Sequence, residues 1–166
     1  MIKLVNDTIN NKDIDQLVEW LKTYPRLTKG PLTIELEQKW SNWLGVKNSI
    51  FCNSGSSANL LMLWALVEAK RITTNAKIVV PSTAWATDLS PVIQLEDTCE
   101  SMGSKWSSKK LGTFGLMSSF STYFGHHIST IEGGFVSTDD EELYEVLKSI
   151  RSHGWDRDSS TKYSKQ

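Results

Sequence analysis

Two adjacent histidines, His126 and His127, lie between a strand-like segment and the turn Glu132-Gly133-Gly134. Neighbouring side chains diverge, so such a pair rarely chelates a single metal ion. An imidazole whose pKa lies near neutrality can act alone as a general base. These residue types therefore favour proton transfer over metal binding, and an ordinary surface histidine is the alternative interpretation at each position.

The segment Gly55-Ser56-Ser57 follows a short β-like run and precedes an apolar helical run from Leu60 to Lys70. Backbone N–H groups, two hydroxyls and the positive end of a helix dipole together suit a phosphate dianion. The segment lacks the lysine of a Walker loop, and small polar residues also make turns and cap helices. Taken alone, it predicts either a phosphate site or a helix cap.

Asp97 and Trp85 are further candidates to bind a ligand that contains a ring. Asp97 follows the apolar run Val92 to Leu95, so its carboxylate is expected at a half-buried strand end, where it needs a cationic partner. A protonated pyridine nitrogen is one such partner, and a structural ion pair or a helix cap is the alternative. Trp85 could stack on a ligand ring, although core packing explains a tryptophan equally well.

The spacing of apolar residues predicts alternating helices and strands, and hence an α/β fold. A first helix is expected after Asp13, and a second from Pro31 to Gly45. Another helix is expected after Thr138, with acidic residues in its first turn and basic residues near its end. Short strands are expected at 49–52, 77–80, 90–95 and 135–137. The carboxyl ends of such strands are where α/β sheets bind ligands.

Composition narrows the class of protein. The chain has 166 residues with a formal net charge of -1, and it has no basic run interleaved with aromatic residues, so no nucleic-acid partner is expected. No apolar run approaches the about 18 residues that cross a bilayer, and the start lacks a leader-like apolar core, so we expect a cytoplasmic protein. Cys52 and Cys99 are expected to be free thiols, and no metal site is predicted.

Taken in order, five motifs resemble the large domain of the DegT/StrS nucleotide-sugar aminotransferase family: Asn53 to Leu60, Pro81 to Trp85, Leu95 to Gly103, Phe120 to Gly134, and Arg151 to Trp155. They span most of the chain. The resemblance implies the α/β three-layer sandwich of the type I fold of enzymes that use pyridoxal 5'-phosphate (PLP), in a shortened form.

By this resemblance, Gly55, Ser56, Ser57 and Ser121 would hold the cofactor phosphate. Trp85 would stack on the pyridine ring, and Asp97 would pair with the ring nitrogen. His126 stands where most of the family has the lysine that binds PLP covalently, six residues before Glu132. His126 and Glu100 would be the catalytic residues, with Glu100 orienting the cofactor or the base.

The histidine at this position resembles a branch of the family, the GDP-4-keto-6-deoxymannose 3-dehydratases, which make 3-deoxysugars. The resemblance implies that PLP and its pyridoxamine form (PMP) are held without a covalent bond. It also implies a nucleotide-linked 4-keto sugar and glutamate as substrates, and a role in deoxysugar or lipopolysaccharide biosynthesis. His126 would move a proton while the C3 hydroxyl leaves.

The chain also departs from that family. Pro91 to Gln94 runs directly into Leu95-Glu96-Asp97, where the family has a long middle section, and no small C-terminal domain follows Trp155. We therefore expect a reduced PLP-binding large domain at residues 1–155 and a polar, mobile tail at 156–166. Shortened sheets expose edges, so a homodimer or association with a full-length homologue is expected.

Two alternatives to a dehydratase stay open. One is a non-catalytic homologue or binding module that keeps the cofactor pocket or only its fold. The other is a sugar aminotransferase in which Lys105, Lys109 or Lys110 reaches the cofactor.

Overall fold

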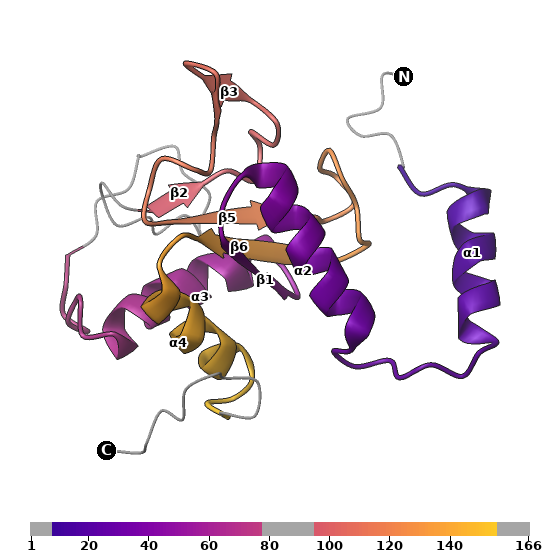
Figure 1. The fold of residues 1–166 in the computed structure, drawn as a ribbon, viewed down its shortest axis with the longest axis horizontal. Helices are drawn as coiled ribbons and strands as arrows, with labels where there is room; N and C mark the ends of the chain where they lie inside the picture. The colour runs from indigo at the N-terminus through magenta and orange to yellow at the C-terminus, as the bar shows by residue number, and fades with distance from the viewer. Residues whose placement is uncertain (1–7, 78–94, 156–166) are drawn as a thin grey trace.

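The structure is a computed structural model that describes residues 8–77 and 95–155 (Figure 1). Its elements in chain order are α1 (Asn11–Leu21), α2 (Pro31–Leu44), β1 (Asn48–Cys52), α3 (Gly55–Glu68), β2 (Leu95–Asp97), β3 (Lys105–Trp106), β4 (Lys109–Lys110), β5 (Met117–Ser121), β6 (Gly134–Thr138) and α4 (Glu141–Arg151). Two helices precede β1, and the five strands β2 to β6 follow one another, so helices and strands are mixed along the chain without the alternation that the apolar spacing predicts.

A four-stranded mixed sheet in the order β1-β6-β5-β2 forms the centre of the molecule. β6 is antiparallel to both β1 and β5, whereas β2 is parallel to β5. In this register Gly134 lies beside Cys52 on one side and Ser121 on the other. The carboxyl ends of β1, β5 and β2 therefore lie at the same end of the sheet, together with the start of β6.

One face of the sheet carries an aromatic layer under α2. The ring of Trp40 stacks on Phe135 with centroids 4.1 Å apart and meets Phe120 edge-on at 5.0 Å. The Trp40 indole also donates to the Ser137 hydroxyl at 3.3 Å. Pro31 at the first position of α2 and left-handed Gly45 at its end bound the helix, as the sequence predicts.

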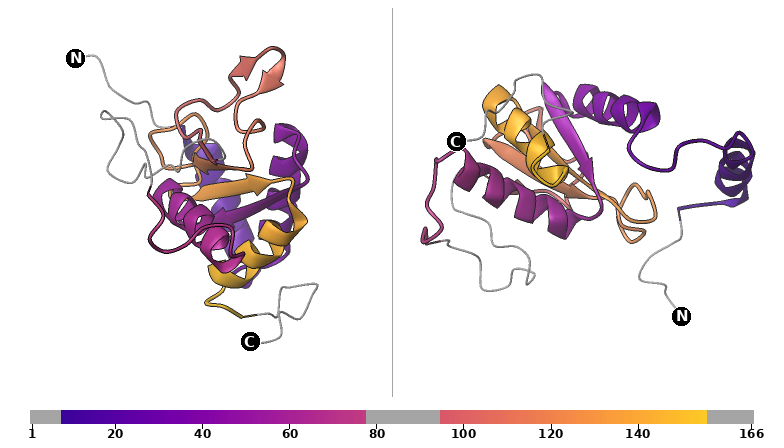
Figure 2. Two further views of the ribbon diagram at one scale, coloured as in Figure 1. Left: turned by 90° about the vertical axis from the view of Figure 1, so that its left-hand side faces the viewer. Right: turned by 90° about the horizontal axis from the view of Figure 1, so that it is seen from below.

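The opposite face is aliphatic and packs against α3 and α4. Its fully buried members include Ile50, Met117 and Val136 from the strands and Leu143 and Leu147 from α4. Side chains of neighbouring strand residues, such as Phe135 and Val136, go to opposite faces because strands alternate. Figure 2 shows helices on both sides of the sheet, so the predicted three-layer α/β sandwich is confirmed for the described residues.

Three local expectations were wrong. Gly55-Ser56-Ser57 is the first turn of α3 and not a loop before it, because Ser54 accepts the N–H of Ser57 and starts the helix there. Asn10 caps α1, while Asp13 closes the capping box. Asp140 rather than Thr138 caps α4. The short β3–β4 hairpin was not anticipated.

Several expected features lie outside the described residues. These are Trp85, nearly all of the strands expected at 77–80 and 90–95, and the tail 156–166. Of the two residues of those strands that the structure describes, Lys77 and Leu95, Leu95 is in regular structure, where it begins β2. Among the described helices, none is long and apolar enough to span a membrane.

Candidate cofactor and proton-transfer site

The start of α3 forms a cradle with two other segments of the chain. A Cβ placed on Gly55 would lie 2.7 Å from the Cβ of Ser121 and 3.1 Å from the Sγ of Cys99. Such distances leave no room for a side chain. The fold therefore brings the first turn of α3, the end of β5 and the loop after β2 together, which is the convergence that the sequence predicts for Gly55 and Ser121.

The hydroxyls of this cradle are fixed by local hydrogen bonds. The Ser54 hydroxyl donates to the Ser57 hydroxyl at 3.1 Å and accepts the Ser57 N–H at 3.0 Å. Ser121 is 7% exposed, and its hydroxyl accepts the N–H of Tyr123 at 3.3 Å. Ser56 is exposed. Hydroxyls at a helix N-terminus, where the dipole is positive, suit a phosphate group.

Glycine is also required where β6 begins. A Cβ on Gly134 would lie 2.4 Å from the carbonyl oxygen of Ser54 and 2.8 Å from the N of Gly55. The backbone of β6 is thus in direct contact with the backbone between β1 and α3. This contact sets the position of the cradle relative to the loop that carries His126.

Asp97 ends β2 and is held on both carboxylate oxygens. Its Oδ2 accepts from the side-chain amide of Asn59 at 2.9 Å, and its Oδ1 accepts the N–H of Cys99 at 3.1 Å. The expectation of a half-buried carboxylate was wrong, since Asp97 is exposed. It lies at the open carboxyl end of the sheet, where an approaching cation could reach it.

His126 and Glu100 come together from separate loops. The Nδ1 of His126 lies 3.6 Å from Oε1 of Glu100. The His126 side chain is 15% exposed, whereas that of Glu100 is 85% exposed. The imidazole also meets the ring of Tyr123 edge-on at 6.4 Å. The family resemblance implied that Glu100 orients either the cofactor or the base, but residue spacing alone gave no reason for the two side chains to lie this close.

The loop that carries His126 is closed at its base by threonines. The hydroxyls of Thr122 and Thr130 lie 2.7 Å apart, and the Thr130 N–H donates to the Thr122 carbonyl at 2.9 Å. A Cβ on Gly133 would lie 2.6 Å from the Thr122 hydroxyl oxygen and 2.7 Å from the Phe51 ring. The closed base holds the loop against the end of the sheet.

The three lysines proposed for an aminotransferase lie on or beside the β3–β4 hairpin. The amine of Lys110 hydrogen-bonds the Trp43 carbonyl and lies 4.8 Å from the centre of the Trp43 ring. The amine of Lys109 lies 4.8 Å from the Phe114 ring. Lys105 is exposed on β3. The described contacts of the Lys109 and Lys110 amines are therefore with Phe114 and Trp43, which are not residues of the cradle.

Sequence reasoning missed two residues of the site. Asn59 holds Asp97 from four positions after Gly55, which places it on the same face of α3, and this spacing was the available signal. The side chain of Cys99 packs against Gly55. Nothing in the sequence around Cys99 indicates this contact. Within residues 8–77 and 95–155, no three histidine, cysteine or acidic side chains are grouped to hold a metal ion.

Comparison with known proteins agrees with this geometry. The profile of the DegT/DnrJ/EryC1/StrS aminotransferase family matches residues 8–96 and 91–166. The chain is 30% identical to GDP-4-keto-6-deoxy-D-mannose 3-dehydratase of Yersinia pseudotuberculosis, covering 93% of this chain and 54% of that protein. It is 32% identical to the enzyme of that name from Escherichia coli O55:H7, covering 78% and 49%.

Solved structures give the same relationship. The chain superposes on the Escherichia coli GDP-4-keto-6-deoxy-D-mannose-3-dehydratase with bound hydrated PLP at a TM-score of 0.86 and 29% identity. The match covers 95% of this chain and 57% of that one. A structure of GDP-4-keto-6-deoxymannose-3-dehydratase with bound GDP-perosamine matches with a TM-score of 0.86 and 28% identity, covering 95% and 56%.

The chain spans about half the length of the curated relatives it matches. The alignment with the Yersinia protein extends over 215 residues, more than the 166 of this chain. The relative therefore contains an internal stretch without a counterpart here, as the sequence motifs predict. The two family matches meet at residues 91–96, which is where the middle section was expected to be missing.

Proposed function

Because the chain belongs to the DegT/DnrJ/EryC1/StrS aminotransferase family, we propose that it is the cofactor-binding part of a PLP/PMP-dependent nucleotide-sugar enzyme. The reaction we propose is 3-dehydration of a nucleotide-linked 4-keto-6-deoxy sugar, with glutamate as the amino donor. One observation carries the proposal. A histidine paired with a carboxylate, His126 with Glu100, stands beside a phosphate-type cradle where the family's lysine is expected.

The residues present fit the cofactor. Gly55, Ser56, Ser57 and Ser121 would hold its phosphate, and the absence of room for a Cβ at Gly55 shows how closely the start of α3 packs against Ser121 in this cradle. Asp97, oriented by Asn59 and at an open strand end, would pair with the ring nitrogen. Trp85, the proposed stacking residue, lies outside the described residues.

When bound, the cofactor would supply an electron sink beside the sugar carbon that loses its hydroxyl. His126 would move the proton. A carboxylate beside Nδ1 favours the tautomer that carries hydrogen there, which leaves Nε2 to accept a proton. Because Glu100 is 85% exposed, water screens its charge, and its proposed role is to orient the ring.

A non-catalytic binding module is the second candidate. It is favoured by the internal residues of the Yersinia relative that have no counterpart in this chain. The third candidate, an aminotransferase, is disfavoured because the amines of Lys109 and Lys110 contact the rings of Phe114 and Trp43, which are not residues of the cradle.

We also propose that the chain associates with a second copy or with a full-length homologue. The aliphatic side chains of α1 support this, since all four are between 41% and 46% exposed: Ile14, Leu17, Val18 and Leu21. Sedimentation of the purified chain tests it. A dimer is expected, and a well-folded monomer at micromolar concentration would contradict the association.

Incubation of the chain with PLP and glutamate tests the function. We expect the absorbance of PLP to convert to that of PMP, and borohydride to leave no cofactor attached to the protein. His126→Lys is expected to gain a bond that borohydride makes permanent, whereas His127→Lys, its exposed neighbour, gains none. Saturable binding without conversion would favour the binding module. A cofactor fixed to the unaltered chain would favour the aminotransferase.

A further inference from the structure

The β3–β4 hairpin projects from the body of the molecule near β2 (Figure 1). The seven residues from 103 to 109 are all exposed. Trp106 is 70% exposed, the highest value for any tryptophan in the described residues, and Phe114, which follows the hairpin, is 47% exposed. Two large rings that meet water at one projection indicate a surface that contacts a partner.

The exposed rings lie on the same side of the hairpin as a lysine. The strand register places Trp106 opposite Lys109, and Lys105 opposite Lys110. Residues directly opposite each other in an antiparallel pair share a face. The amine of Lys109 also lies 4.8 Å from the centre of the Phe114 ring. Two aromatic rings are therefore gathered around one amine on the outward face of the hairpin.

The other face holds the hairpin against α2. The amine of Lys110 hydrogen-bonds the Trp43 carbonyl and lies 4.8 Å from the centre of the Trp43 ring. The N–H of Leu111 donates to the Ser104 carbonyl at 2.9 Å and closes the base of the hairpin. The outward face is thus presented in a fixed position, which lowers the entropy cost of binding.

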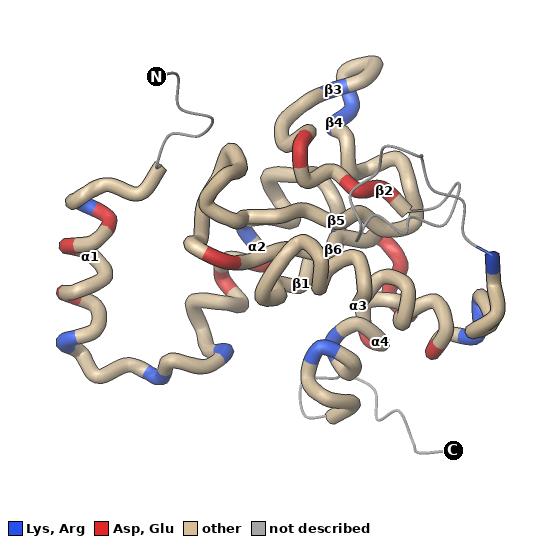
Figure 3. Tube along the Cα trace, turned by 180° about the vertical axis from the view of Figure 1, so that it is seen from behind, with Lys and Arg blue, Asp and Glu red and all other residues tan. Residues whose placement is uncertain are grey.

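The sequence around the hairpin is basic. No aspartate or glutamate lies between Glu100 and Glu132, and this stretch contains Lys105, Lys109 and Lys110. The whole chain has a formal net charge of -1, so positive charge is concentrated here. Figure 3 shows lysines on both strands of the hairpin, with the nearest acidic segments in the body of the molecule. Such a local positive surface attracts anions.

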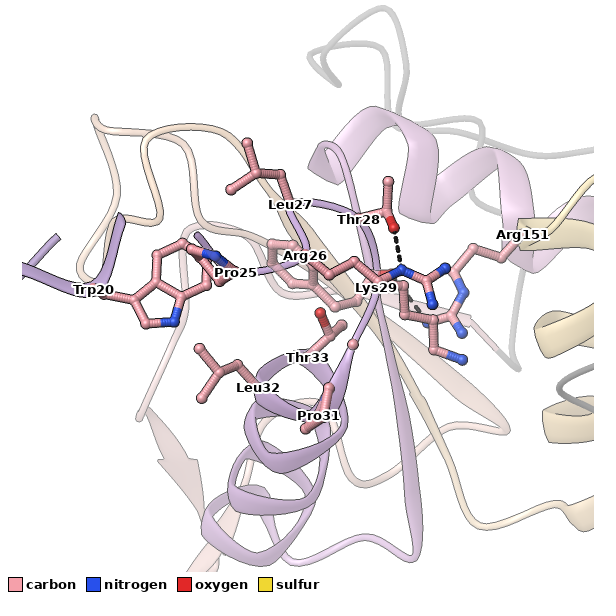
Figure 4. Close-up of a pocket in the computed structure, with 12 residues that line it drawn as sticks. Trp20, Pro25, Arg26, Leu27, Thr28, Lys29, Pro31, Leu32, Thr33 and Arg151 are labelled. Atoms are coloured by element: carbon pink, nitrogen blue, oxygen red, sulfur yellow. Dashed lines mark hydrogen bonds between the residues drawn. The ribbon is translucent and has the colours of Figure 1, made fainter. Parts of the chain in front are cut away.

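A second cluster of basic side chains differs in its direction. Arg26, Lys29 and Arg151 line a pocket of about 510 Å³ between the α1–α2 connection and the start of α2. In Figure 4 the guanidinium groups of Arg26 and Arg151 point into this space, and Arg151 also pairs with Glu37. An enclosed cluster of this kind suits a small ligand, whereas the lysines of the hairpin face outward.

The size of the hairpin favours a lipid surface over a protein partner. A stable protein interface takes about 20–30 residues on each side, and the projecting hairpin offers seven. A bilayer surface requires no complementary shape. Tryptophan rings settle at the level of the headgroups, and lysines near the surface are attracted by anionic lipids.

We infer that the β3–β4 hairpin docks the chain onto an anionic lipid surface. Trp106 and Phe114 lie at the level of the headgroups, and Lys105 and Lys109 pair with the lipid phosphates. This contact lies on the bilayer surface without spanning it. The inference is independent of the proposed function, since it involves no residue of the cradle.

Co-sedimentation of the full chain with lipid vesicles tests the inference. We expect binding to vesicles of phosphatidylcholine and phosphatidylglycerol in equal parts to be at least about tenfold tighter than to phosphatidylcholine alone. The reason is that each lysine near anionic lipid adds about fivefold. About 1 M salt is expected to release the chain, because the screening length falls to about 3 Å.

Substitutions in the hairpin locate the contact. Trp106→Ala is expected to weaken vesicle binding about tenfold through lost apolar contact, and Lys109→Ala about fivefold. The matched controls are Trp155→Ala and Lys39→Ala, because Trp155 is 53% exposed and the Lys39 side chain 74% exposed elsewhere in the molecule. Both controls are expected to bind like the unaltered chain. Trp106→Phe is expected to retain binding and to reduce the quenching of tryptophan fluorescence by brominated lipid.

Three results would overturn the inference. One is equal binding to both kinds of vesicle, or equal losses in Lys109→Ala and Lys39→Ala. Another is the absence of vesicle binding by a chain that has the circular dichroism of a folded protein. The third is tighter binding to poly-glutamate than to vesicles without a loss in Trp106→Ala, which would assign the hairpin to an acidic protein partner.

Discussion

The first and last helices have the same length but differ in how much of their surface is buried. α1 and α4 each have 11 residues, apolar side chains at helical spacing and a side chain that caps the first turn. α4 buries Leu143, Val146 and Leu147 against the sheet, whereas α1 buries no residue and stands away from the sheet (Figure 1). The difference shows that an amphipathic pattern predicts an apolar face without predicting what covers it.

The surroundings of the two helices explain the difference. α4 ends at Arg151, whose ion pair with Glu37 ties the helix to α2 and β1. α1 is joined to the sandwich by the connection from Lys22 to Gly30, and its side chains Ile14 and Leu17 line a second pocket with the loop from His127 to Ile131. Substitutions in α4 should therefore change global stability, and those in α1 should not.

Loss of the buried ion pair should have the largest effect. Glu37→Ala leaves Arg151 buried without its acid and removes the acceptor of the Phe51 N–H, so we expect a loss of about 3–5 kcal/mol. Glu19→Ala removes the exposed partner of Lys22 in α1 and should cost about 0–0.5 kcal/mol. Urea unfolding of both variants measures the contrast, and equal losses would contradict it.

Truncation of the apolar faces comes next. Leu147 is 0% exposed, and Leu147→Ala should cost about 2–5 kcal/mol through lost burial and a cavity. Leu17 is 41% exposed, and Leu17→Ala should cost less than about 1 kcal/mol. Thermal unfolding at low concentration provides the comparison. A concentration-dependent loss in Leu17→Ala at higher concentration would agree with the proposed association through α1, whereas a large loss that does not depend on concentration would contradict the comparison.

The helix caps should show a smaller contrast. Asp140 accepts the N–H of Leu143 at 3.0 Å, and Asp140→Ala should cost about 1–2 kcal/mol because the ion pair with Arg71 is lost as well. Asn10→Ala removes the corresponding cap of α1, whose unfolding is not expected to be coupled to that of the sandwich. Far-UV circular dichroism should show a small loss of helix in Asn10→Ala without a change in the unfolding midpoint.

The smallest expected effect is a pH dependence from Asp140. Burial raises the pKa of this carboxyl, but hydrogen bonds from Arg71 and from the Leu143 N–H outweigh it and hold the pKa below its ordinary value. Its stabilising contribution is therefore present above the unfolded-state pKa of about 3.9 and is lost as the pH falls through the folded-state pKa. Asp140→Asn keeps a capping side chain and should show a flatter stability curve below about pH 4. Identical curves would contradict this account.

Much of the fold was predictable because its signals are local. Pro31 and Gly45 bound α2 as their backbone preferences require, period-3.6 spacing located α1, and the order of acidic and basic residues located α4. The start of α3 was misplaced because Gly55-Ser56-Ser57 has the composition of a turn, and only the Ser54 cap makes it helical. The four-stranded order depends on pairings distant in sequence, which no local pattern encodes.

The candidate site was predictable in its members but not in its contacts. Motif order placed Gly55, Ser121, Asp97 and His126 in one site, and the structure brings Gly55 and Ser121 into contact. The hydrogen bond from Asn59 to Asp97 joins residues that are 38 positions apart in the sequence, so it depends on how α3 packs. The exposure of Asp97 could not be read from the apolar run before it, since burial of a strand does not extend past its end.

Titration of the folded chain with PLP tests the central claim most directly. The account predicts saturable uptake of a single cofactor per chain, complete release on dialysis, and weaker binding in Asp97→Asn and Ser56→Ala variants that retain the circular dichroism of the unaltered chain. Absence of saturable uptake by folded chain, alone and with a full-length relative, would contradict it.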